Sequence, residues 1–191
     1  QQLAKVTACR DNLRFICGDA QQLPFRDDYF DLVYCRCVLE HLADPLCAVR
    51  EMRRVLKAGG RVALLENNTP QQDFYPDAPT GAELIRKFCE VQSILGGDAA
   101  IGKKLFHYLT VVGFRDIALS IQPEIHTASQ PTFVWWMQNM ISIAEAAAEQ
   151  IIGHHLMTRS QIEKGLGELR EVKNRPDGSC YSYWNRAEAI K

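Results

Sequence analysis

Two short apolar segments with a helical pattern between them constrain the fold of this chain most strongly. Residues 29–36 and residues 62–65 are nearly continuous apolar runs, as expected of parallel strands that are covered on both faces. Residues 45–57 carry apolar side chains at helical spacing, namely at Leu46, Val49, Met52 and Leu56. A strand, a helix and a strand at this spacing predict a βαβ unit with a right-handed crossover, and therefore an α/β fold.

The helix predicted at residues 45–57 has recognisable end signals. Asp44 is suited to the N-cap, and Pro45 to the first helical position. We expect Gly59 to end the helix in a left-handed conformation, which glycine adopts without steric cost.

The remaining elements follow from the same periodicities. We expect loops at residues 18–28 and 70–80, and a turn at Asp177-Gly178. Helices are predicted at residues 1–9, 82–95, 101–112, 131–155 and 158–173, with Gly113 closing the third of these. Further strands are predicted at residues 13–17, 114–121 and 179–191. A chain of 191 residues suits a single domain of ordinary size.

Composition and charge exclude some functional classes. Hydrophobic residues make up 47% of the chain and charged residues 24%, which is typical of a globular protein. The formal net charge is -1, and Lys and Arg are spread along the sequence, so a nucleic-acid partner has no electrostatic support. No apolar run is long enough to span a membrane. We therefore expect neither a nucleic-acid partner nor a membrane span.

The seven cysteines show no paired CxxC spacing, and most lie within apolar runs. We interpret them as small buried hydrophobic residues in a reducing compartment, which predicts a cytoplasmic protein. Cys35 and Cys37 are two residues apart at the end of a strand, so their side chains are placed to share a face. A metal site there would need further ligands, and the sequence offers none, so no metal is predicted.

Three predicted strand ends carry polar residues that suit a ligand site. These ends are Gly18-Asp19-Ala20, Cys35-Arg36-Cys37 and Glu66-Asn67-Asn68. Ligands of open α/β sheets bind outside the carboxyl ends of the strands, so we expect the three ends along one rim. An ionised Asp19 accepts hydrogen bonds and suits an exocyclic amine such as that of adenine. The alternative, that Asp19 caps a turn, is equally compatible with the spacing.

Three segments in succession resemble a known family. They are GDAQQLPF at residues 18–25, FDLVYCRCVLEH at residues 30–41 and EMRRVLKAGGRVALLE at residues 51–66. Together they are similar to class I S-adenosylmethionine-dependent methyltransferases, a group that includes ubiquinone and menaquinone biosynthesis enzymes and natural-product methyltransferases. The resemblance covers residues 13–66 well and extends more loosely to residues 96–98, 101–105 and 113–114. It implies a Rossmann-like, doubly wound and mostly parallel sheet, with an antiparallel C-terminal strand and a helical insertion before it.

The resemblance also implies roles for individual residues. Asp19 would accept a hydrogen bond from the adenine amine of S-adenosylmethionine, and the backbone of Ala20 would contact the ring. Cys35 and Arg36 would line the methionyl side of this cofactor. His41 would lie close to the same pocket, where it either acts as a base or is an ordinary residue of a short helix.

Two parts of the family's cofactor site have no counterpart in this sequence. One is the acidic-Gly-x-Gly-x-Gly segment, and the other is the acidic residue that holds the ribose hydroxyls. We expect both to precede residue 1 in the native protein, because the chain starts inside a predicted helix. The alternative is a chain that is not a competent enzyme.

The acceptor of the methyl group is expected beneath a cover at residues 124–175. Methyl transfer needs in-line alignment and exclusion of water more than elaborate chemistry. The resemblance suggests that Phe74, Tyr75 and this cover enclose the acceptor, and His126 lies where it could reach it. Trp135 falls opposite the apolar stripe of its helix, so it contacts a partner, a lid or a flat ligand, or has no role.

The favoured hypothesis is a cytoplasmic enzyme that transfers a methyl group to a small, apolar or aromatic acceptor. The alternative is a non-catalytic binding module with a methyltransferase-like fold, supported only by the missing glycine-rich segment. A nucleotide-dependent reductase is disfavoured, because Leu-Pro-Phe and Leu-Glu-His after these strands do not suit a nicotinamide site. The helix at residues 131–155 is expected to serve as a lid or as a homodimer face.

Overall fold

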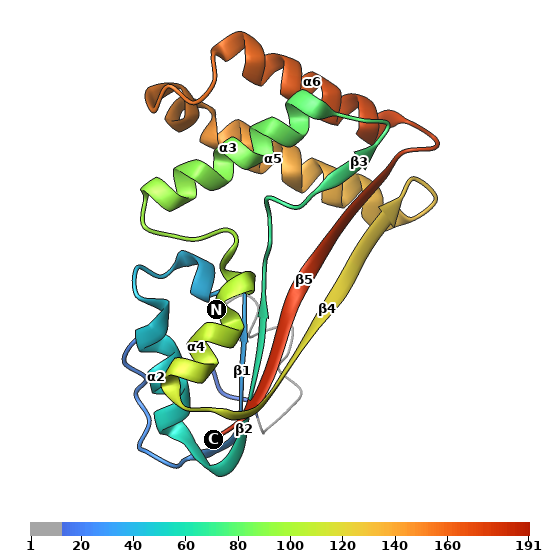
Figure 1. The fold of residues 1–191 in the computed structure, drawn as a ribbon. Coiled ribbons are helices and arrows are strands. Elements are labelled where there is room, and N and C mark those ends of the chain that lie inside the picture. Colours follow the sequence, from blue (N-terminus) through green and yellow to red (C-terminus); the bar gives the residue numbers. More distant parts are fainter. Residues whose placement is uncertain (1–12) are drawn as a thin grey trace.

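The computed structural model describes residues 13–191 as a mixed α/β fold around a five-stranded sheet (Figure 1). The strands are β1 (Phe30–Arg36), β2 (Leu56–Glu66), β3 (Asp73–Tyr75), β4 (Arg115–Thr127) and β5 (Ser179–Ile190). The α-helices are α2 (Pro45–Val55), α3 (Pro79–Ile94), α4 (Leu105–Val112), α5 (Pro131–Gly153) and α6 (Arg159–Asn174). Two short 3-10 helices complete the elements, η1 (Leu39–His41) and η2 (Ile101–Lys104). None of the helices in this part of the chain combines the length and apolar character needed to cross a membrane.

The strand order confirms the predicted α/β class and the antiparallel C-terminal strand. The sheet runs β1-β2-β5-β3, and β4 also pairs with β5. β1 and β2 are parallel, whereas β5 pairs antiparallel with β2, β3 and β4. Within residues 13–191 the parallel part of the sheet is therefore confined to the βαβ unit of β1, α2 and β2.

The strand predicted at residues 13–17 is not formed. This segment has no ladder partner among residues 13–191, and Phe15 and Ile16 are 63% and 60% exposed. An apolar segment becomes a strand only where a neighbouring strand satisfies its backbone groups. The prediction was wrong because the pattern of apolar residues contains no information about that neighbour.

The lower core lies between the sheet and the helices α2 and α4, which cover the same face (Figure 1). Asp44 caps α2 as predicted, since its Oδ1 accepts the N–H of Cys47 at 3.0 Å. The predicted role of Gly59 was wrong: α2 ends at Val55, and Gly59 adopts its left-handed conformation (φ 75°) inside β2. Gly113 closes α4 with φ 87°, as expected.

The upper core is formed by α3, α5 and α6, which pack together over the far ends of β3, β4 and β5 (Figure 1). Phe133, Met137 and Ile141 are among the fully buried side chains of α5. α3 and α6 cross at glycines: a Cβ at Gly165 would lie 2.9 Å from the carbonyl oxygen of Thr80. The absent side chain therefore lets the two helix backbones approach closely.

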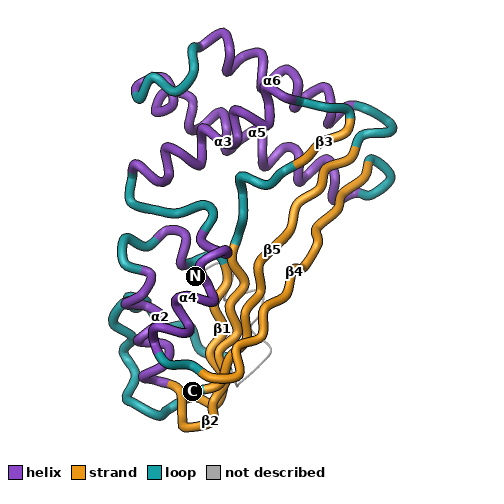
Figure 2. The backbone as a smooth tube through the Cα atoms, viewed as in Figure 1, coloured by secondary structure: helices purple, strands orange, loops and turns teal. Residues whose placement is uncertain are grey.

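Strands β4 and β5 connect the two cores. They contain 13 and 12 residues and pair from Arg115 opposite Ile190 to Thr127 opposite Ser179 (Figure 2). Part of the cover predicted at residues 124–175 is thus strand, because residues 124–127 belong to β4 and the helices begin at Pro131. β3 lies within the predicted loop at residues 70–80 and pairs with β5 over three residues.

The face of β1 opposite α2 and α4 is not covered by any helix of residues 13–191 (Figures 1 and 2). Leu32 and Tyr34 point to this face and are 58% and 61% exposed. Their neighbour Cys35 points the other way and is buried in the lower core. The alternation of the strand therefore exposes a large apolar surface on one side of the sheet.

Candidate functional site

The carboxyl ends of β1 and β2, two of the three strand ends predicted from the sequence, meet at one rim of the sheet. Arg36 lies opposite Leu65 in the parallel ladder, and the N–H of Cys37 donates to the carbonyl of Leu65 at 3.0 Å. Beyond this point β1 continues into η1, and Cys37 turns the chain with a left-handed φ of 53°. The segment between β1 and η1 therefore forms the edge of the rim.

Asp19 has the turn-capping geometry that was one of its two interpretations. Its Oδ1 accepts the N–H of Gln21 at 2.8 Å, and its backbone bridges to Gln22. The following residues are held to α2, since Glu51 Oε2 accepts the N–H of Leu23 at 2.8 Å. Ala20 packs against the lower core. The adenine contacts of Asp19 and Ala20 stay predictions.

Cys35 and Arg36 lie on opposite faces of the sheet, although the resemblance assigns both to the methionyl side. The Cys35 thiol is 5% exposed and donates to Glu66 Oε1 at 3.6 Å. Burial, together with the charge of Glu66, raises the pKa of this thiol to about 12. Arg36 is exposed, and its guanidinium lies 5.1 Å above the Trp184 ring. Of the two side chains, only that of Arg36 is accessible from solvent, and the cofactor contacts of both stay predictions.

The sequence analysis placed Glu66 at one of the three strand ends but gave it no role of its own. This residue ends β2, is 0% exposed, and its Oε1 accepts the N–H groups of Val38 at 3.3 Å and Leu39 at 3.2 Å. Burial raises the pKa of Glu66, although these N–H groups oppose the shift. The signal was present in the sequence as an acidic residue that directly follows a buried apolar run.

His41 lies at the end of η1 and faces solvent, with 65% of its side chain exposed. Its Nε2 is 3.6 Å from Oε1 of Glu40, a carboxylate that is itself buried. Burial raises the pKa of Glu40, and the neighbouring His41 opposes that rise. The ring is therefore accessible at the rim, and a base role for His41 stays a prediction.

A polar cavity of about 370 Å³ lies on the Arg36 face of the sheet. It brings Arg36 together with His126, which is about ninety residues away in the chain. His126 Nδ1 is 3.0 Å from Thr132 Oγ1, and its Nε2 is 3.3 Å from Glu124 Oε1. The Trp184 indole N–H donates to the other oxygen of Glu124. Both nitrogens of His126 are thus engaged within the protein.

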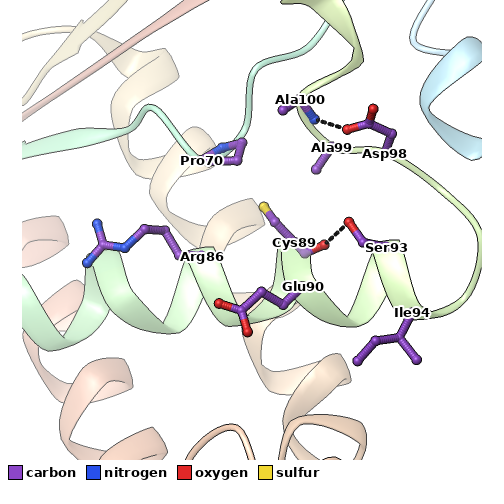
Figure 3. A pocket seen from close by; sticks show the side chains of 9 residues that line it. All are labelled: Pro70, Arg86, Cys89, Glu90, Ser93, Ile94, Asp98, Ala99 and Ala100. Carbon is purple, nitrogen blue, oxygen red and sulfur yellow. Dashed lines mark hydrogen bonds between the residues drawn. The ribbon is translucent and has the colours of Figure 1, made fainter.

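An apolar cavity of about 490 Å³ lies between α3 and the segment before η2 (Figure 3). Pro70, Cys89 and Ala99 face one another across it, and Arg86 and Glu90 lie at its border (Figure 3). Burial raises the pKa of the Cys89 thiol to about 12, so this group behaves as an apolar wall. A small molecule with an apolar body fits this volume and lining.

The other predicted acceptor residues are not brought together with this rim. Phe74 is buried in the upper core at 7% exposure, whereas Tyr75 is 54% exposed. Trp135 is 66% exposed, as its position opposite the apolar stripe predicted. Among residues 13–191 no cluster of three His, Cys, Asp or Glu side chains is arranged to hold a metal ion.

A βαβ unit with functional groups at the carboxyl ends of its strands, continued by antiparallel strands and a helical cover, defines the Rossmann-like methyltransferase class of folds. Solved structures agree. A putative methyltransferase from Bacillus halodurans C-125 superimposes with a TM-score of 0.58 at 17% identity, covering 100% of this chain and 76% of that one. The YcgJ protein of Bacillus subtilis gives 0.58 at 19% identity, covering 100% and 75%.

The sequence comparisons are more specific, and each covers about a third of the chain. Residues 1–64 match the methyltransferase domain family. The uncharacterized methyltransferase YcgJ of Bacillus subtilis is 46% identical over 61 residues, which are 32% of this chain and 24% of that protein. A demethylmenaquinone methyltransferase of Staphylococcus aureus is 45% identical over 64 residues, 34% of this chain and 27% of that protein. The matches thus span about a quarter of the length of these curated relatives. These matches confirm the predicted resemblance to class I S-adenosylmethionine-dependent methyltransferases over about a third of the chain.

Proposed function

We propose that this chain transfers a methyl group from S-adenosylmethionine to a small, apolar or aromatic acceptor. The observation that carries the proposal is the rim at the ends of β1 and β2, which lies in or directly beside the segment matching the methyltransferase domain family. Ligands of such sheets bind at this rim. The free cysteines among the described residues suit a reducing compartment, and we propose the cytoplasm.

The residues at the rim fit the two ends of the cofactor. Asp19 and Ala20 would hold the adenine, and the Arg36 guanidinium would hold the methionyl carboxylate. Arg36 suits this role because no carboxylate of residues 13–191 forms an ion pair with it, while Trp184 supports it from below. When bound, the cofactor supplies an electrophilic methyl group, and the protein's part is to orient the partners and exclude water.

We propose that the acceptor binds in the apolar cavity beside α3. The cavity borders the rim, because Asp98 at its edge donates its N–H to the carbonyl of Glu40 at 2.8 Å. His41 does not line the cavity itself, but it follows Glu40 at this border, and in a base role it would take a proton from an acceptor hydroxyl or amine. Phe74, Tyr75 and His126 line neither the apolar cavity nor its border, so their contacts would depend on larger acceptors.

Trp135 belongs to a different surface. It lies on α5 next to Val134, and the two side chains are 66% and 54% exposed. We assign this exposed pair to the predicted homodimer contact through the helical cover, since large apolar residues in a patch favour association. Gel filtration of Trp135→Ala, with a shift toward the monomer, tests this part of the proposal.

Calorimetric titration of S-adenosylhomocysteine and of methylthioadenosine tests the cofactor assignment. Methylthioadenosine lacks the amino-acid end, so Arg36→Gln is expected to weaken only S-adenosylhomocysteine, by roughly tenfold. Asp19→Ala is expected to weaken both ligands. Arg170→Gln, on the distant helix α6, is the matched control and should bind both like the wild type. Absence of binding by the native protein would contradict the proposal and favour the non-catalytic module.

A further inference from the structure

Glu66 is a buried residue at the end of β2, and its carboxylate accepts hydrogen bonds from the segment that follows the neighbouring strand β1. It follows Leu64 on the face of β2 that forms the lower core, and both side chains are 0% exposed. From there its Oε1 accepts three hydrogen bonds from the segment of β1 and η1, namely from the Cys35 thiol and from the N–H groups of Val38 and Leu39. A side chain that served only the core would be apolar at this position.

The two N–H groups that Glu66 accepts are the free donors at the start of η1. The first turn of any helix leaves its N–H groups without intrahelical partners, and a side chain of the N-cap residue usually accepts one of them. Val38 occupies that position in η1 and has no side chain able to accept. Glu66 therefore caps η1 from the neighbouring strand.

The capped segment is the part of the rim that changes direction. Cys37, directly before Val38, has a left-handed φ of 53°, a conformation that a non-glycine residue adopts only when its surroundings impose it. Arg36 precedes this turn and His41 follows it at the end of η1. The hydrogen bonds of Glu66 thus fix the path of the chain between the two side chains proposed for the site.

Retention of this carboxylate has a cost in stability. A buried charged group is unfavourable unless hydrogen bonds compensate it, and Glu66 Oε2 has no partner among residues 13–191. The residue opposite in β5 is Asn185, whose Nδ2 also lacks a partner among them. The Glu66 carboxylate destabilises the core and forms its hydrogen bonds with the residues of the rim. We therefore look for its role at the rim.

We propose that Glu66 is a positioning residue, which caps η1 across the strand boundary and thereby holds the Arg36–His41 segment in the conformation that binds the cofactor. This inference rests on the proposed function for the identity of the ligand. Its structural part, the capping of η1, is independent of any ligand.

Two substitutions of Glu66 separate positioning from general stability. Glu66→Gln keeps an oxygen that accepts both N–H groups, whereas Glu66→Met has similar length and accepts neither. Leu64→Ala is the matched control, because it removes buried apolar volume from the same face of β2 and leaves the hydrogen bonds between Glu66 and η1 in place. We would measure the dissociation constant of S-adenosylhomocysteine by calorimetry, and the amide hydrogen exchange of Val38 and Leu39 by NMR.

We expect Glu66→Met to raise the dissociation constant by roughly tenfold and to release the two amides to exchange. Glu66→Gln should stay within about twofold of the wild type, and Leu64→Ala should lose thermal stability but keep its affinity. Equal affinity of Glu66→Met and the wild type, or equal losses in Glu66→Met and Leu64→Ala, would overturn the inference.

The design distinguishes the two proposals. If the wild type binds no S-adenosylhomocysteine, the proposed function fails and the cofactor part of the inference falls with it. The exchange measurement still decides the capping of η1 in that case. If Glu66→Met does not fold, Glu66→Gln decides the question. Protected amides of Val38 and Leu39 in this variant would support the capping of η1, and rapid exchange of both amides would overturn it.

Discussion

Neighbouring residues at the end of β1 have opposite environments, and this decides what each can do. The sequence resemblance placed Cys35 and Arg36 on the same side of the cofactor, but successive side chains of a strand point to opposite faces. Cys35 is hydrogen-bonded to Glu66 inside the lower core, and Arg36 is exposed over Trp184. A family pattern can locate a strand end, whereas the direction of each side chain follows from which face is covered.

We predict that Cys35 does not react with iodoacetamide at neutral pH. Its thiol is buried and its pKa is raised to about 12, so almost no thiolate is present. Cys17 is exposed and serves as the internal control, which should be alkylated within the same reaction. Peptide mass spectrometry measures both sites, and alkylation of Cys35 at the rate of Cys17 in the folded protein would contradict the described burial.

The titration of Glu66 predicts a pH dependence of stability. Because burial raises its pKa above the value of 4.5 expected when unfolded, the folded state holds the proton more tightly. The resulting contribution is fully present below pH 4.5 and is lost as the pH rises through the folded pKa. Several other carboxyl groups have lowered pKa values and act in the opposite direction, for example Glu51 and Glu83.

The difference between wild type and Glu66→Gln isolates this contribution, since the other groups are common to both. We expect the stability of the wild type relative to Glu66→Gln to fall as the pH is raised from 4.5 to 7, as measured by thermal melts. The titratable groups around Glu66 and the neighbouring Glu40 are Cys35, Cys37, His41 and Asp98. All of them are present in both the wild type and Glu66→Gln. A difference that is constant with pH would show that Glu66 titrates normally.

Elements with a strong local signal were predicted well, and those that depend on a distant neighbour were not. α5 begins at the predicted residue and α6 one residue after it, and Asp44 caps α2 as expected. β4 extends to Thr127, beyond the predicted end at residue 121, even though Pro123 lies inside it. Proline is tolerated there because β4 pairs only with β5 in the described sheet and has one free edge.

The crossing of α3 and α6 gives a prediction with a control on the same helix. Gly165→Ala is expected to lower the free energy of unfolding by about 1–3 kcal/mol, because its Cβ would lie 2.9 Å from the carbonyl oxygen of Thr80. Gly167→Ala meets nothing within 4 Å and should instead be stabilising by up to about 1 kcal/mol. Urea denaturation measures both, and equal effects would show that the helices do not approach this closely.

At the scale of the whole molecule, helices cover one face of β1 and β2 and leave the other face exposed. α2 and α4 bury one face of β1 and β2, while Leu32 and Tyr34 remain exposed on the other. The predicted α/β class describes the covered face correctly. It also predicted that β1 is covered on both sides, which residues 13–191 do not provide.

We predict that this apolar face promotes self-association. Leu32→Thr combined with Tyr34→Thr keeps residues that favour strands, and should reduce light scattering at high protein concentration. The free energy of unfolding should change by only about 0.5 kcal/mol. Val62→Thr, at a position of 0% exposure, is the control and should be destabilising by about 1–3 kcal/mol. Unchanged scattering of the double variant would mean that the face is shielded.

The shared ribbon of β4 and β5 limits how the molecule can move. Cys180 of β5 belongs to the upper core, while Ala187 and Ala189 of the same strand belong to the lower core. A rotation of α3, α5 and α6 as one rigid lid would therefore bend the paired strands β4 and β5. It would also break the hydrogen bonds that join these two strands between the cores. The segment between α3 and α4 is not part of the sheet. Gly96 has φ 91° there, and η2 is the only regular element in this segment. Because Asp98, Ala99 and Ala100 of this segment line the apolar cavity, a displacement of the segment would change the width of the cavity while the β4–β5 ribbon stays in place.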